Sequence, residues 1–139
     1  GTSTSLMLMG ALTDYLSFGF WYAHATAENR DFRSRGDGGG LRVEAFPLVS
    51  IAPSFAGLGL AAQFGIGSAN LTSKTPGVPT AEGTQSFVGA GVFHEWTLAR
   101  LLGGHLAAGP SLEYDAIWSQ PFERHGLTAS ARVVFYGGP

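Results

Sequence analysis

The sequence predicts an all-β fold, an antiparallel up-and-down β-barrel that spans a membrane. Three observations predict it: strand-length segments that alternate between two kinds of residue, glycine-rich rows opposite the apolar rows, and no charge on any apolar row. Only 13% of the 139 residues are charged, about half the usual fraction for soluble proteins, whereas 45% are apolar and 21 are glycine. This length suits one domain, covering residues 1–139.

Alternation is clearest at residues 105–119, where apolar residues from Leu106 to Trp118 form one row and small or acidic residues from Ala107 to Ser119 form the other. A soluble barrel would turn its small residues and glycines towards water. A membrane barrel turns the apolar row to lipid and fills its crowded interior with small and paired charged residues. We expect seven such segments, at residues 3–12, 15–27, 40–49, 54–69, 85–99, 105–119 and 125–136.

Charged residues fall away from the rows expected to face lipid. Most lie in predicted turns and loops, and the remaining six lie on interior rows. An Arg or Lys facing lipid at mid-membrane would cost about 2–4 kcal/mol, and side chains nearly fill a barrel of about eight strands. We therefore expect a lumen charge network that plugs the barrel, with a polar conduction path as the alternative reading. Its members are Arg42, Glu44, Glu95, Glu113, Asp115 and Arg132.

Aromatic residues are expected on the outward rows, several of them near strand ends. Aromatic side chains gather at the two membrane interfaces of such barrels, where they form girdles. The alternative is a soluble core built from the same side chains. The expected girdle consists of Phe18, Phe20, Tyr22, Trp96, Tyr114, Trp118 and Phe135.

Connections between the segments alternate in length. Short turns are expected at 13–14, 48–53 and 101–104, and long polar loops at 28–39 and 70–84. Membrane barrels place short turns on the periplasmic side and long loops outside. A proline in mid-strand removes a ladder hydrogen bond, so Pro110 predicts a nearby bulge.

Seven segments conflict with the even strand number of single-chain bacterial barrels. About eight strands are therefore expected, of which this chain shows seven. Either an N-terminal strand precedes Gly1, or a protein partner or oligomer completes the barrel, or one segment has been divided or merged wrongly.

The last predicted strand carries a resemblance. The run from Gly126 to Tyr136 resembles the C-terminal strand of outer-membrane β-barrels, with alternating apolar positions that close on an aromatic residue, although this chain continues to Pro139. In strand length and loop rhythm the whole chain is similar to small eight-stranded barrels of the OmpA/OmpX type. The resemblance implies a porin-like architecture in a Gram-negative bacterial outer membrane, surrounded by outer-membrane lipid and lipopolysaccharide.

The expected function is non-enzymatic, a structural or interaction role exerted through the surface loops or a partner chain. A narrow channel or transporter for small solutes is the alternative, followed by a lipid A-modifying enzyme and a soluble ligand-binding β-barrel. Outer-membrane deacylases use a His-x-Ser arrangement that all four histidines of this chain lack, although Thr26 follows His24 at the same spacing. No catalytic residue is therefore assigned.

Other ligand classes are not expected. The histidines are isolated and the chain has no cysteine, so neither a metal site nor a cofactor is predicted. Eight Lys and Arg are spread along a chain of net charge −2. Nucleic acid, which needs a concentrated basic patch, is not expected as a partner.

Overall fold

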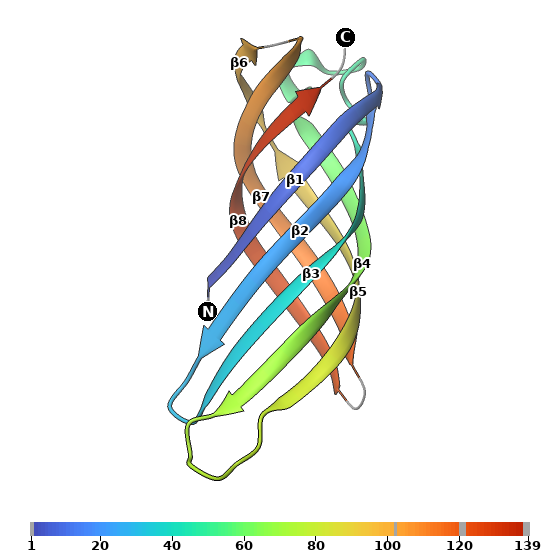
Figure 1. Cartoon of the computed structure of the whole chain (residues 1–139). Coiled ribbons are helices and arrows are strands. Elements are labelled where there is room, and N and C mark those ends of the chain that lie inside the picture. Colours follow the sequence, from blue (N-terminus) through green and yellow to red (C-terminus); the bar gives the residue numbers. More distant parts are fainter. Residues whose placement is uncertain (1, 102, 120–121, 138–139) are drawn as a thin grey trace.

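The computed structural model describes residues 2–101, 103–119 and 122–137, and strands dominate it (Figure 1). One 3-10 turn, Pro53–Phe55, is its single helical element in these ranges, and no helix there is long and apolar enough to cross a membrane. The strands are β1 (Thr2–Thr13), β2 (Leu16–Glu28), β3 (Phe32–Ala45), β4 (Leu58–Ser73), β5 (Ala81–His94), β6 (Trp96–Leu101), β7 (Gly104–Ser119) and β8 (Phe122–Gly137).

Seven of the strands close into a barrel in the order β1, β2, β3, β4, β5, β7, β8 and back to β1. Six of these neighbouring pairs are antiparallel, but β1 and β8 run parallel, through Met9 with Tyr136 and Gly10 with Gly137. The sheet is therefore mixed, and the expectation of a purely antiparallel barrel is wrong at this junction. An odd number of alternating strands leaves the first and the last pointing the same way.

The predicted segment 85–99 appears as two strands, β5 and β6, separated by Glu95. The ladder to β7 keeps one register on both sides of this break. That register places Pro110, which has no N–H to donate, opposite His94, the residue before Glu95. The bulge expected near Pro110 lies elsewhere, between Thr97 and Ala99 of β6. Within the described ranges β6 pairs only with β7, so it extends the barrel wall without entering the ring.

The predicted loop at 28–39 is wrong, because residues 32–45 form β3 and only residues 29–31 connect it to β2. The glycines from Gly36 to Gly40 suggested a loop because glycine is poor in strands. Here glycine allows β3 and β4 to lie close together, because a Cβ on Gly40 would overlap the carbonyl oxygen of Phe64.

The predicted loop at 70–84 is also shorter than expected. Strand β4 continues to Ser73 and β5 begins at Ala81, so residues 74–80 form the connection. This connection and the β2–β3 connection lie at the lower end of the barrel in Figure 1, opposite the turn between β1 and β2. The strands thus reach further towards this end than the apolar pattern indicated.

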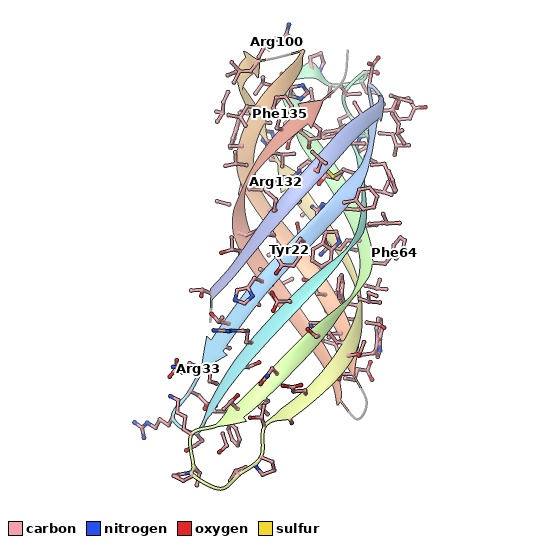
Figure 2. The ribbon with its side chains drawn as sticks, in the orientation of Figure 1. Tyr22, Arg33, Phe64, Arg100, Arg132 and Phe135 are labelled. Carbon is pink, nitrogen blue, oxygen red and sulfur yellow. The ribbon has the colours of Figure 1, made fainter. Side chains whose placement is uncertain are left out.

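Burial in this barrel is the reverse of that in a soluble one. Among the largest side chains with almost no exposure are those of Arg42 and Glu44, whereas Leu6 is 74% exposed and Leu127 70% exposed. Sticks in Figure 2 show apolar side chains such as Phe64 projecting away from the wall. A small apolar cluster around Met9 packs inside near the upper end.

Candidate functional site

Arg42, on the inner face of β3, joins three strands in the middle of the barrel. Its Nε donates a hydrogen bond to Glu44 at 2.6 Å, its Nη1 to Gln63 of β4 at 2.7 Å, and its Nη2 to Glu113 of β7 at 2.9 Å. The guanidinium is buried, so these contacts replace the water that it loses. The result is a fixed crosslink between strands that are distant in the sequence.

Gln63 extends this group towards the lower end of the barrel. Its Nε2 donates to Asp115 at 2.9 Å and lies 3.3 Å from Glu113. We did not expect Gln63 in the network, because it carries no charge. Its place on an inward row was the one signal that could have identified it.

Arg132, on β8, forms the upper half of the network (Figure 2). Its Nη2 donates to Glu44 at 2.9 Å, and its guanidinium carbon lies 3.9 Å from the ring centre of Phe93. The hydroxyl oxygen of Tyr136 lies 2.8 Å from Glu44 and 3.1 Å from Glu95. Glu44 therefore connects the two arginines, and all six predicted charged residues fall into one connected set with Gln63 and Tyr136.

The network fills the interior with groups that hold each other in place. Arg42, Glu44, Glu95 and Arg132 are all buried, and Glu113 and Asp115 are partly buried. Protein atoms in the described ranges leave Nε and Nη1 of Arg132 without a hydrogen-bond partner. The arrangement can brace opposite walls and obstruct the passage between them.

The predicted aromatic girdle faces outward, but at several levels. Tyr22 donates its hydroxyl hydrogen to Asp37 at 2.6 Å, and the Nε1 of Trp118 donates to Glu123 at 3.3 Å, so these residues sit where the apolar wall gives way to polar residues. Tyr114 makes a similar contact, at 2.6 Å, with Nδ1 of His125. The other four lie closer to the upper end along their strands: Phe18, Phe20, Trp96 and Phe135.

Two outer-wall clusters combine tyrosine, histidine and a carboxylate. In the first, Asp37 accepts from Tyr22 and lies 2.7 Å from Nδ1 of His24. The hydroxyl of Thr26 lies 3.1 Å from that of Thr2, and none of the described contacts joins it to His24.

The second cluster places His125 between Tyr114 and Glu123, with 3.0 Å between Nε2 and the carboxylate. Neither cluster was expected, because each joins residues two apart on one strand to a residue on the next. Within the described ranges no group of three His, Asp or Glu side chains could hold a metal ion.

Comparison with known proteins identifies no family for this chain. No family model matches it, and neither a curated protein nor a solved structure gives a significant match. The function therefore has to be inferred from the contacts of the chain itself.

Proposed function

We propose that this chain is a bacterial outer-membrane β-barrel, sealed by its charge network, with a structural or interaction role and no enzymatic one. The observation that carries the proposal is the reversed burial: arginine and glutamate side chains are buried inside while leucines are exposed outside. In water this arrangement would carry two free-energy costs. The exposed leucines would leave apolar surface hydrated, and the buried charges would lose their contact with solvent. A hydrocarbon environment removes the first cost.

The outer wall supports the same proposal. On β4 the outward row runs from Leu60 through Phe64 and Ile66, all about half exposed or more, before it turns polar at Ser68 and Asn70. On β3 the outward row likewise changes from Val43 and Leu41 to Asp37, Arg35 and Arg33. No Asp, Glu, Lys or Arg occupies the apolar part of the described outward rows. An apolar band bordered by polar strand ends is what a bilayer requires.

The interior contacts support a sealed barrel over a channel. Arg42 and Arg132 reach Glu44 from different strands, and Gln63 links the lower acids to Arg42. Moving an ion through this region would require breaking several buried charge-assisted hydrogen bonds together. The network is therefore proposed as a brace and plug, which leaves the lower connections and the outer wall to interact with lipid or protein.

Two measurements test the proposal. Membranes of expressing cells are washed with alkaline carbonate and then extracted with detergent, and the chain should remain in the membrane until detergent is added. Purified protein in planar bilayers should give no steady current, and neither should Glu82→Gln, which alters an exposed carboxylate near the lower end. Release by carbonate would contradict the membrane assignment, and a steady current through the unchanged protein would contradict the plug.

A further inference from the structure

The junction between β1 and β8 is the weakest part of the barrel wall. Two residue pairs, at Met9 and Gly10 of β1, make up its described ladder, whereas β8 pairs with β7 over its whole length. From Thr2 to Leu8 on β1, and from Phe122 to Phe135 on β8, one backbone edge has no described partner strand. Unpaired edges in a bilayer are costly, because hydrocarbon offers no hydrogen bonds.

The inner side of this junction is also open. Thr128 and Ser130 stand on the inward row of β8 and are exposed, whereas Arg132, Val134 and Tyr136 further up the same row are buried. The inward row of β8 thus changes from exposed to buried between Ser130 and Arg132, below the point at which Met9 of β1 pairs with Tyr136 of β8.

The glycines also indicate open space on the inner side of this junction. A Cβ placed on Gly126, on the inward row of β8, would meet nothing within 4 Å. On the opposite wall, a Cβ on Gly40 or Gly65 would overlap neighbouring backbone. A side chain at Gly126 would therefore enter open space beside β8, whereas one at Gly40 or Gly65 would not.

Strand direction defines what fits the opening. Because β1 and β8 run parallel, one strand laid between them in the opposite direction would be antiparallel to both. The other ring strands, β2, β3, β4, β5 and β7, are each paired on both edges, and the connection at residues 46–57 lies at the upper end of the barrel, away from this opening. The missing strand therefore has to come from outside these residues.

We propose that the β1–β8 junction is a docking site for one extended segment of another polypeptide, bound antiparallel to both edges. Its outward residues are apolar, to continue the band formed by Leu6 and Leu127, and its inward residues are small or polar, to meet Ser5, Thr128 and Ser130. The apolar half of this pattern rests on the proposed membrane setting. The backbone pairing does not.

The test uses the full chain in detergent micelles and two synthetic peptides of about ten residues, the length of a membrane strand. One peptide alternates leucine with serine, and the other has the same composition with its leucines in one block. Spin labels on Leu6→Cys and Val133→Cys report the distance across the junction, and labels on Ala62→Cys and Ala90→Cys report a control pair between β4 and β5. Binding should lengthen the first distance by about 5 Å, one strand spacing, and leave the second unchanged.

A disulfide across the junction provides the matched control. Gly10 and Gly137 are paired, and a Cβ on either has room, so Gly10→Cys with Gly137→Cys should lock β1 to β8. The lock should weaken binding of the alternating peptide at least about tenfold, whereas a disulfide between Ala62→Cys and Ala90→Cys should not. Equal binding to locked and unlocked protein, or equal binding of the two peptides, would overturn the proposal.

Two other occupants are outcomes of the test, a segment of the same protein that precedes Gly1 and a second copy of this chain. A longer chain that carries such a segment and no longer binds the alternating peptide would contradict docking of another polypeptide. Sedimentation without peptide covers the second copy. A dimer that the Gly10–Gly137 lock abolishes would assign the junction to that copy and contradict docking of another polypeptide. A monomer that binds one alternating peptide supports the proposal. Because these experiments use detergent, their failure would leave the carbonate extraction test of membrane insertion unaffected.

Discussion

Glu44 on β3 and Arg132 on β8 meet across the barrel interior, with 2.9 Å between the carboxylate and Nη2, although 88 residues separate them in the chain. Glu44 also accepts from Arg42, so one carboxylate connects two arginines on opposite walls. Both side chains of the Glu44–Arg132 pair are almost fully buried. Their contact depends on closure of the barrel and reports on it.

Replacing Glu44 with glutamine should lower the free energy of unfolding by about 3–5 kcal/mol, because it leaves two buried guanidinium groups without their shared counter-charge. Equilibrium denaturation in detergent micelles measures this loss. The control is Glu82→Gln, which removes an exposed charge and should change the free energy by less than about 1 kcal/mol. Equal effects of the two substitutions would contradict the structural role of the network.

Gly40→Ala should destabilise the barrel by about 1–3 kcal/mol, since its Cβ would overlap the backbone of Phe64 and Gly65 and force β3 and β4 apart. The matched substitution is Gly126→Ala, whose Cβ enters open space beside β8. The two denaturation midpoints should differ clearly, with Gly126→Ala close to the unchanged protein. A tolerated Gly40→Ala would mean that β3 does not continue through residues 36–40 as a close-packed strand.

Two substitutions on the outer face of β4 locate the edge of the apolar band. Ala62→Arg places a charge within the band and should cost about 2–4 kcal/mol in a lipid bilayer, whereas Ser68→Arg, six residues along the same row, should cost about 0–1 kcal/mol. Unfolding from lipid vesicles measures both. A cost that does not depend on position would argue against a bilayer around this wall.

The lower end carries a titratable ion pair. Hydrogen bonding to Lys74, with the nearby positive charge of Arg33, lowers the pKa of the Glu28 carboxyl below its usual 4.5. A lowered pKa stabilises the fold above the unfolded pKa, and this contribution disappears as the pH falls below about 4.5 and through the folded pKa. Lys74→Gln should raise the Glu28 pKa towards 4.5, as followed by carboxyl carbon NMR. Arg100→Gln at the upper end of the barrel (Figure 2), as the control, should leave it unchanged.

Much of the wall could be predicted from alternation alone. The segment predicted at 105–119 matches β7 within one residue, and the structure places Glu113 and Asp115 of its inward row in the network. Alternation succeeds here because the two faces of each strand meet very different surroundings.

Alternation failed where strands continue past the apolar band. Arg33, Arg35 and Asp37 suggested a loop, yet they lie on the outer face of β3 where polar residues are tolerated. The parallel contact of Met9 with Tyr136 could not be predicted either, because it depends on closure of the whole ring. Gln63 was not predicted as a member of the network, because uncharged polar residues are common on the inward rows of such strands.

Tryptophan quenching by lipids brominated on their acyl chains tests the reversed barrel most directly. Trp96 and Trp118 face outward and are 58% and 43% exposed, whereas Trp21 packs inside against Phe87. In reconstituted vesicles, variants that keep only Trp96 or only Trp118 should be quenched strongly, and a variant that keeps only Trp21 should be quenched much less. Equal quenching of all three, or none at Trp96 and Trp118, would contradict a barrel whose outer wall faces lipid.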